Sequence, residues 1–368
     1  MRLKVKIQRL LKVARYSHRA VPVWSRQYPK TFKRAERLCR LERFLPEEAF
    51  RLGLFNKDAD AAEQGRYLSR KKLTKVQKTL NPVSWVAVLK NKGLFYTFCS
   101  AFGIAIPRLY AMYFPRCAGW SYLAHNLKKR NEWRRFIRDR LPDEFVIKPA
   151  RGAYGRGVNV FKRVGNGFVS AQGKYCRADD IYEMIRSDPD GFLIQQRLKN
   201  HPSIVRLSGT EALQTVRIIT FVDEKCRPHV IHAHFKPIVG DHIIDTYLDG
   251  LIGNVEAKVR LSDGVLAAAN QVTGNGDGIR IVSRHPRTGS LFEGFRLPFW
   301  DQACRVVKEA AAGFVPIRTI GWDVALTPEG VRVVEGNVWW DAPNQHGTMP
   351  GIVETLQSAK SAAIYTDH

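Results

Sequence analysis

The sequence predicts an α+β fold with a basic, mainly helical N-terminal region. Residues 1–20 have the spacing of an amphipathic helix, whereas residues 145–161 and 320–341 each hold two short strand-like runs around a turn. The chain has 368 residues, of which 45% are hydrophobic, an ordinary share for a globular protein with a real core. We therefore expect roughly two or three domains.

The positive charge is concentrated near the N-terminus. The formal net charge is +25, and residues 1–80 contain 22 Lys and Arg but only 7 Asp and Glu. Within residues 1–20, apolar side chains recur on one helix face and basic side chains fill the rest, which is typical of a helix that binds a membrane surface or a partner. A terminal helix packed on its own domain is the alternative. A bound polyanion fits the charge, whether acidic lipid, phosphorylated glycan or nucleic acid. Nucleic acid is the least expected, since no binding module for it is recognisable.

Cysteine usage and hydropathy predict a cytoplasmic protein. The six cysteines are scattered without a CxxC pair, which favours reduced thiols. The first 20 residues lack the apolar segment of a secretory signal. The longest apolar run, Leu94–Ile106, has 13 residues and is too short to cross a bilayer. The basic N-terminus adds peripheral contact with the anionic inner face of the membrane as a second expectation.

Residues 145–161, FVIKPARGAYGRGVNVF, predict a strand, a glycine-rich loop and a second strand. Lys148 follows the first strand-like run, and Gly152, Gly155 and Gly157 lie close together after it. Glycines permit positive φ, successive N–H groups can bind an anion, and a lysine adds a point charge for phosphate. A Rossmann motif or a P-loop is excluded, because a helix would have to follow the loop directly. The stretch is either a hairpin that folds over nucleotide phosphates or an ordinary glycine-rich hairpin.

Residues 320–341, IGWDVALTPEGVRVVEGNVWWD, predict a second hairpin. With a three-residue loop at 328–330, counting outward along both strands places Asp323 opposite Glu335. Asn337 lies two residues further on and therefore points to the same face. Oxygen ligands suit a hard cation, and Mg²⁺ usually binds one or two carboxylates together with substrate phosphates. The alternative is three exposed polar side chains at the base of a hairpin.

Together, the glycine-rich hairpin with its lysine and the later Asp…Glu-x-Asn pattern resemble the ATP-grasp superfamily. The run GWDVALTPEGVRVVEGN is similar to the metal-binding hairpin of the sugar-transfer-associated ATP-grasp group, which looks like the α-L-glutamate ligase-like enzymes. The resemblance implies an ATP-grasp fold, in which two sheet-bearing lobes clasp ATP. It implies four segments: a basic helical region 1–80, a pre-ATP-grasp domain 81–144, a lid lobe 145–198 and a catalytic lobe 199–368.

The resemblance also implies a nucleotide site. Lys92 begins a predicted helix at the position where ATP-grasp proteins have a phosphate-binding lysine, although a solvated lysine is an equal alternative. The strand at 191–198 corresponds to the hinge that holds adenine. Gln195 and Gln196 stand where an acidic residue usually binds ribose, and a glutamine can still hydrogen-bond a hydroxyl group. The implied ATP-binding residues are Lys92, Lys148, Gly152, Ala153, Gly155, Gly157, Gln195, Gln196 and Leu198.

The resemblance leaves open which basic residue acts on the transferred phosphate. The family places an arginine near the transferred phosphate, and Arg217 on the predicted strand 215–221 matches it; a structural ion pair is the alternative. Many ligases of this fold carry another arginine two residues before the aspartate, where this chain has Gly321. Arg217, Lys236 or Arg318 would then take that role, or the acyl-phosphate step differs.

The resemblance implies an ATP-dependent carboxylate–amine ligase with an acyl-phosphate intermediate. Its cofactors would be ATP and Mg²⁺, with Mn²⁺ as an alternative metal, and Asp323, Glu335 and Asn337 would hold the ion. Its substrates would be a small carboxylate and an amine, an amino acid or amino sugar, in cell-surface polysaccharide, glycoconjugate or amino-acid conjugate synthesis. Two alternatives stay open: a phosphotransferase acting on a sugar or lipid-linked hydroxyl, and a non-catalytic basic protein that binds anionic lipid or nucleic acid.

Overall fold

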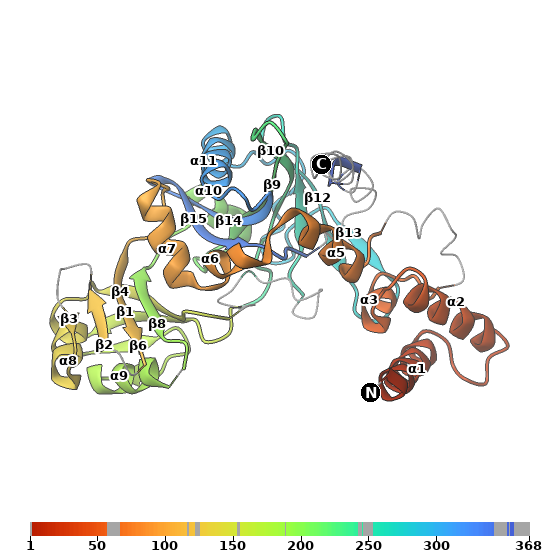
Figure 1. Ribbon diagram of the computed structural model, residues 1–368, viewed down its shortest axis with the longest axis horizontal. Coiled ribbons are helices and arrows are strands. Elements are labelled where there is room, and N and C mark those ends of the chain that lie inside the picture. The colour runs from red at the N-terminus through yellow and green to blue at the C-terminus, as the bar shows by residue number, and fades with distance from the viewer. Residues whose placement is uncertain are drawn as a thin grey trace.

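Two antiparallel sheets form one side and the centre of the molecule, and N-terminal helices extend away from them (Figure 1). The computed structural model describes residues 2–56, 67–115, 118–121, 126–152, 155–187, 189–241, 245, 253–341, 352 and 354–356. The predicted α+β fold with a helical N-terminal region is confirmed. None of the described helices is long and apolar enough to span a bilayer.

The helices are concentrated before residue 102. They are α1 (Arg2–Ala20), α2 (Tyr28–Arg40), α3 (Pro46–Arg51), α5 (Arg70–Leu80), the 3-10 helix η1 (Val83–Trp85), α6 (Val86–Lys90), α7 (Lys92–Ala101), α8 (Arg130–Asp139), α9 (Ala178–Arg186), α10 (Pro202–Ser208) and α11 (Trp300–Gly313).

The first sheet has eight strands in the order β3-β2-β1-β8-β4-β5-β6-β7. Aromatic and aliphatic side chains of the sheet, among them Phe145 and Phe161, share one core with Trp133 of α8 and Ile181 of α9. Strands β1–β3 lie before residue 144 and β4–β8 begin at or after it. The sheet therefore contains residues of both predicted segments, 81–144 and 145–198. Its strands are β1 (Leu109–Phe114), β2 (Ala118–Ser121), β3 (Asn126–Leu127), β4 (Glu144–Pro149), β5 (Asn159–Val164), β6 (Gly167–Ser170), β7 (Tyr175–Cys176) and β8 (Phe192–Gln196).

The second sheet has seven strands in the order β13-β12-β11-β10-β9-β14-β15. Helix α11 covers one face, where Ala303 and Val307 share a core with Val324 of β14 and Val333 of β15. On the opposite face, Ile219 and Phe221 of β9 pack with Leu73 of α5, and polar side chains occupy the rest of the central strands. The strands are β9 (Thr215–Val222), β10 (Pro228–Phe235), β11 (Glu256–Val259), β12 (Leu266–Val272), β13 (Ile279–Val282), β14 (Thr319–Thr327) and β15 (Gly330–Asn337).

Helices α1–α3 form a unit with a core of its own. Val13, Leu38 and Phe50 are buried together in it. The unit contacts the seven-stranded sheet at the loop that connects β12 to β13. There Asn56 Nδ2 donates a hydrogen bond of 3.1 Å to the carbonyl of Gly276. A glycine-rich loop therefore supports the N-terminal unit, because a side chain at Gly276 would collide with Phe50.

Substituting Gly276 with alanine is expected to destabilise this contact. The φ of Gly276 is +99°, and a Cβ there would lie 2.5 Å from the ring of Phe50. Positive φ and overpacking each cost about 1–3 kcal/mol. Gly274→Ala is a matched control, since its φ is +73° but no heavy atom lies within 4 Å of the added Cβ. Urea unfolding should give a lower free energy of unfolding for Gly276→Ala than for Gly274→Ala, and equal values would contradict the contact.

Candidate active site

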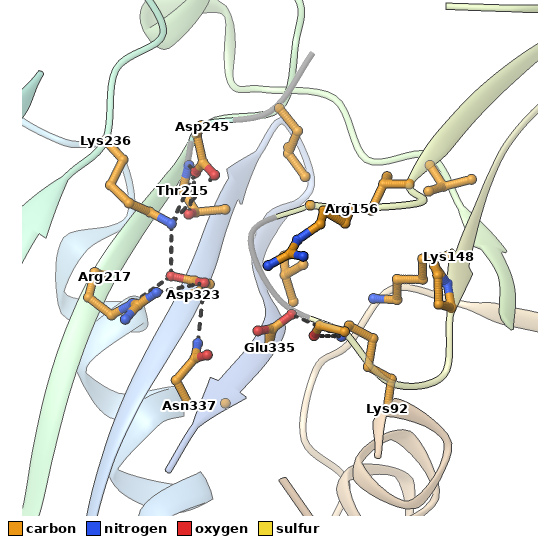
Figure 2. A pocket seen from close by; sticks show the side chains of 18 of the residues that line it. Lys92, Lys148, Arg156, Thr215, Arg217, Lys236, Asp245, Asp323, Glu335 and Asn337 are labelled. Carbon is orange, nitrogen blue, oxygen red and sulfur yellow. Dashed lines mark hydrogen bonds and ion pairs between the residues drawn. The ribbon is translucent and has the colours of Figure 1, made fainter. Parts of the chain in front are cut away.

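A cavity of about 1240 Å³ lies between the two sheets. The glycine-rich hairpin β4–β5 and strand β8 line it from the eight-stranded sheet, and β9, β10, β14 and β15 line it from the seven-stranded sheet. Figure 2 shows polar side chains from both sides pointing into this space. Ligand pockets are typically about 300–1000 Å³, so the cavity has room for more than one small ligand.

A row of polar residues crosses the seven-stranded sheet. His234 on β10 pairs with Arg217 on β9, Arg217 pairs with Asp323 on β14, and Asp323 pairs with Glu335 on β15. Directly opposite residues of antiparallel strands share a face of the sheet. All four residues line the cavity, so the sheet places side chains from distant parts of the chain side by side.

The hairpin β14–β15 reaches this arrangement by a different register from the predicted one. Its turn has two residues, because Thr327 pairs with Gly330, and the predicted three-residue loop is wrong. A β-bulge next to Asp323 then shifts the pairing by one residue, so that Asp323 does lie opposite Glu335. The bulge inserts one extra residue into β15 and compensates for the shorter turn.

Asp323 is the centre of a partly buried ion network (Figure 2). Arg217 donates to both carboxylate oxygens, with Nε at 2.7 Å and Nη2 at 3.1 Å. Lys236 Nζ donates at 3.0 Å and Asn337 Nδ2 at 3.4 Å. Burial alone would raise the pKa of Asp323, but the facing cations Arg217 and Lys236 lower that pKa far below its ordinary value. Asp323 is therefore ionised throughout the physiological pH range.

Asp245 is a second carboxylate of this network that the sequence did not reveal. It accepts hydrogen bonds from both the backbone N–H and the hydroxyl of Thr215, and lies 3.4 Å from Lys236 Nζ. Burial lowers the pKa of Lys236, but Asp245 and Asp323 outweigh it and the pKa is raised. No sequence motif distinguishes Asp245, because its place in the network depends on the contact with Thr215, the first residue of β9.

Lys148 lies on the opposite side of the cavity and is only 5% exposed. Its Nζ donates to the hydroxyl of Tyr96 at 3.1 Å, and that hydroxyl donates to Gln195 Oε1 at 2.7 Å. Burial, and next the nearby charge of Lys92, lower the pKa of Lys148 to about 7, while Glu335 acts in the opposite direction. Tyr96 was missed by the sequence analysis; its position one helical turn after Lys92 is the only signal.

Lys92 connects the glycine-rich loop to the second hairpin. It begins α7, as predicted, and the side chain of Asn91 caps this helix by accepting from the N–H groups of Gly93 and Leu94. Lys92 Nζ donates to the carbonyl of Gly152 at 3.0 Å and lies 3.6 Å from Glu335 Oε2. The two motifs that were recognised separately in the sequence therefore meet at Lys92.

The rest of the predicted ATP-binding set divides into two groups. Gly152 and Gly155 line the cavity, whereas Gly157 packs closely against Pro149. Ala153 lies outside the described residues. The cavity wall on and just after β8 contains Gln195, Gln196 and Leu198. Arg156, in the glycine-rich loop, also lines the cavity, although nothing in the sequence singled it out.

Arg318 does not join the other cations. Its Nε donates to the carbonyl of Val222 at 3.0 Å, its guanidinium lies over the ring of Phe221, and among the described residues it is not part of the cavity wall. Position 321 itself has no space for a side chain, because a Cβ there would lie 2.7 Å from Trp340 and 3.3 Å from Arg217 Cδ. Arg217 thus occupies the space beside Gly321, and Arg318 is removed from the candidate site.

The oxygen donors on β14 and β15 fit a hard divalent cation. Asp323, Glu335 and Asn337 offer two carboxylates and one amide. Within the described part of the chain, no group of three or more His, Cys, Asp or Glu side chains is placed to hold a metal ion. Mg²⁺ commonly binds one or two carboxylates and takes its other ligands from water and substrate phosphates, so the donor set suits an ion that arrives with a nucleotide.

The lowered pKa of Lys148 gives a pH-dependent prediction. Above pH 7 the amine is increasingly neutral, while a bound phosphate favours its charged form, so ATP binding should take up a proton. We expect the apparent ATP affinity to fall by up to about tenfold per pH unit above pH 7. Lys92, Glu335 and Tyr96 surround Lys148. Calorimetry in two buffers of different ionisation enthalpy measures the uptake, and Lys148→Met should abolish it.

The lowered pKa of Lys148 also predicts how the stability of the folded protein changes with pH. Because the pKa of Lys148 is lower in the folded protein than its ordinary value of 10.5, the unfolded chain binds more protons between about pH 7 and 10.5. The contribution of Lys148 to the free energy of unfolding therefore rises with pH across that window and is least favourable below pH 7. A stability profile that falls across the window in the wild type relative to Lys148→Met would contradict the shift.

The comparison with protein-family models agrees with the sequence resemblance. The model of the family described as sugar-transfer associated ATP-grasp matches residues 71–360. N5-carboxyaminoimidazole ribonucleotide synthetase from Thermotoga maritima is 9% identical with a TM-score of 0.35, and the match covers 74% of this chain and 49% of that one. The L-amino acid ligase from Bacillus licheniformis is 11% identical with a TM-score of 0.38, and the match covers 73% of this chain and 46% of that one. The D-alanine–D-alanine ligase from Coxiella burnetii is 12% identical with a TM-score of 0.39, and the match covers 77% of this chain and 62% of that one.

This chain spans about half the length of the first two of these structures and less than two thirds of the third. No curated protein matches the sequence. Since the structural similarities are low, the family assignment rests on the family model, which covers most of the chain.

Proposed function

This chain belongs to the sugar-transfer associated ATP-grasp family, and we propose that it is an ATP- and Mg²⁺-dependent carboxylate–amine ligase that acts through an acyl phosphate. The observation that carries the proposal is the row Arg217–Asp323–Glu335, which faces Lys148 and Lys92 across one cavity. It combines phosphate-binding cations with hard oxygen ligands in a single space.

Lys148, Lys92 and the N–H groups of the glycine-rich loop would hold the phosphates of ATP. Both lysines are held by hydrogen bonds, Lys148 by a buried one to Tyr96 and Lys92 by an exposed one to the carbonyl of Gly152. Gln195, Gln196 and Leu198 would bind the adenosine part, since they line the cavity along and after β8. The nucleotide would then lie between the two sheets, with its γ-phosphate towards Glu335.

The proposed reaction has two steps. A carboxylate oxygen of the first substrate attacks the γ-phosphorus, the bond from that phosphorus to the bridging oxygen breaks, and ADP leaves. The amine of the second substrate then attacks the acyl carbon, phosphate leaves with the C–O bond electrons, and the amine nitrogen loses a proton. Phosphoryl transfer depends mainly on positioning and charge neutralisation.

Arg217 and Lys236 would supply fixed positive charge for both steps. Lys236 is buried, Arg217 is partly buried, and both are bonded to Asp323, so each is held in place before substrate binds. Charges in a site with little water act more strongly than in bulk solvent. Asp323, Glu335 and Asn337 would hold Mg²⁺, which when bound neutralises charge on the phosphate oxygens of ATP.

The family description points to sugars, which supports an amino sugar as the amine and a role in cell-surface polysaccharide or glycoconjugate synthesis. An amino acid is the second candidate for the amine. Use of ATP supports a cytoplasmic location, which we propose together with this function. The space beyond a single nucleotide in the cavity supports two further small substrates.

Hydroxylamine trapping tests the proposal. The purified protein is incubated with ATP, Mg²⁺, hydroxylamine and a panel of amino acids and uronic acids. A ligase converts its carboxylate substrate into a hydroxamate, which iron(III) colours, and releases one ADP and one phosphate per hydroxamate. Glu335→Gln serves as the inactive reference.

Two other outcomes identify the alternatives. A phosphorylated sugar or lipid-linked acceptor, with ADP release but no hydroxamate and no free phosphate, identifies a phosphotransferase. Absence of ATP binding and turnover across the panel, in a protein whose basic surface binds anionic lipid or nucleic acid, identifies a non-catalytic binding protein.

A further inference from the structure

Helix α1 exposes a group of apolar side chains although another of its faces is buried. Ile7, Leu10 and Leu11 are exposed, and Leu11 is 65% accessible. Residues at these spacings lie on one side of a helix. Apolar side chains that stand in a contiguous exposed group mark interaction surfaces more often than scattered ones do.

The packing of α1 determines which face is exposed. Val13 is fully buried in the core of the N-terminal unit. The ring of Tyr16 lies 5.3 Å from that of Phe50 on α3, and the guanidinium of Arg19 lies over the same ring at 4.9 Å. An α-helix turns about 100° per residue, which places Leu11 nearly opposite Val13 and pointing away from the rest of the protein. Leu10, three residues before Val13, lies at the edge of the buried side and is partly exposed there. Figure 1 shows α1 at the opposite end of the molecule from the eight-stranded sheet.

The exposed face continues into the segment after α1. The rings of His18 and Trp24 are 6.2 Å apart in an edge-to-face arrangement, so Trp24 extends the apolar stripe beyond the end of the helix. Trp24 is 84% accessible, and its neighbour Val23 is also exposed. Tryptophan is enriched where proteins meet the headgroup region of membranes, because its ring is apolar and its N–H is polar.

Positive charge surrounds these apolar side chains. Residues 1–40 contain 13 Lys and Arg and a single acidic residue, Glu36. Lys4, Lys6, Lys12 and Arg15 are exposed on α1 itself. Basic residues close to an anionic bilayer attract it, and an apolar face adjacent to them can insert between headgroups.

We propose that an anionic lipid bilayer binds the surface formed by α1 and the segment after it. This α1 docking surface is defined as Ile7, Leu10, Leu11, Val23 and Trp24 together with the exposed basic residues Lys4, Lys6, Lys12 and Arg15. Nucleic acid accounts for the charge but gives the exposed apolar side chains no role. An acidic protein accounts for the charge but would need a fitted pocket or groove for Trp24, whereas a bilayer accepts it without one. The docking surface is independent of the reaction in the cavity, so either can fail without the other.

Vesicle co-sedimentation of the full chain tests this surface. Sucrose-loaded vesicles of equal parts phosphatidylcholine and phosphatidylserine are compared with phosphatidylcholine alone. We expect binding to the anionic vesicles only, weakened by salt through screening. Leu11→Gln and Trp24→Ser should each lower the partition coefficient about tenfold at unchanged net charge. Ile281→Gln is the matched control, because Ile281 is 71% accessible on β13 and lies outside the docking surface.

Three results would overturn the proposal. One is a lack of binding to anionic vesicles at low salt. Another is wild-type binding by both Leu11→Gln and Trp24→Ser, which would show that charge alone attracts the protein. The third is a lipid-free dimer of the wild type that Leu11→Gln dissociates, which would show that a second copy covers the surface. Equal melting temperatures confirm that the variants fold, as expected for substitutions of exposed side chains.

Discussion

Substituting methionine for Lys148 is expected to lower ATP turnover about 100- to 1000-fold, the loss typical of removing one group that stabilises transition-state charge. Lys148 is buried in the cavity wall, where its amine is fixed by Tyr96. Methionine keeps most of the length and apolar contact of the side chain but cannot neutralise a phosphate oxygen. Release of ADP, measured at saturating ATP and across pH, gives the effect on turnover.

The fold should tolerate Lys148→Met. Burial of the amine already lowers its pKa to about 7, so the folded protein gains nothing from the charge without a ligand. Lys162→Met is the matched control, since Lys162 is an exposed lysine on the neighbouring strand β5. Wild-type turnover by Lys148→Met would remove Lys148 from the proposed site, whereas loss of turnover in Lys162→Met would show that the assay reports general damage.

Glu335→Gln is expected to abolish Mg²⁺-dependent ATP turnover, with a decrease of about 1000-fold. Glu335 lies opposite Asp323 in the β14–β15 pair and 3.6 Å from Lys92. Glutamine has nearly the same shape but no negative charge, so it weakens metal binding and leaves the packing intact. The melting temperature with ATP, measured with and without Mg²⁺, reports binding separately from catalysis. A ligand at 100 times its Kd stabilises the folded state by about 2.7 kcal/mol.

The Mg²⁺-dependent rise in melting temperature should appear in the wild type and be absent in Glu335→Gln. Glu329→Gln provides the control, because Glu329 is an exposed carboxylate at the turn of the same hairpin. Normal turnover by Glu335→Gln, or an unchanged Mg²⁺-dependent rise, would contradict the metal assignment. If Mg²⁺ bound equally well with and without ATP, that result would contradict the proposal that ATP phosphates supply some of the ligands of the ion.

The sequence was informative where structure depends on neighbours along the chain. The hairpin β4–β5 follows from strand-like runs on both sides of a glycine-rich loop, and the start of α7 at Lys92 follows from a local helix pattern. The facing of Asp323 and Glu335 was also predictable, although the turn is one residue shorter than expected. A bulge restored the pairing, and bulges leave no clear signal in a single sequence.

By itself, then, the sequence determined the α+β class, the two hairpins, the ATP-grasp resemblance and the basic character of the N-terminal helices. Only the tertiary structure decided which cations accompany Asp323. Arg217 is 106 residues away from it, and they meet because β9 and β14 are adjacent strands. The same pairing places Arg217 beside Gly321 and leaves Arg318 outside the cavity. The physical reason is that periodicity specifies which face of a strand a residue occupies, whereas the order of strands in a sheet is set by packing of the whole chain.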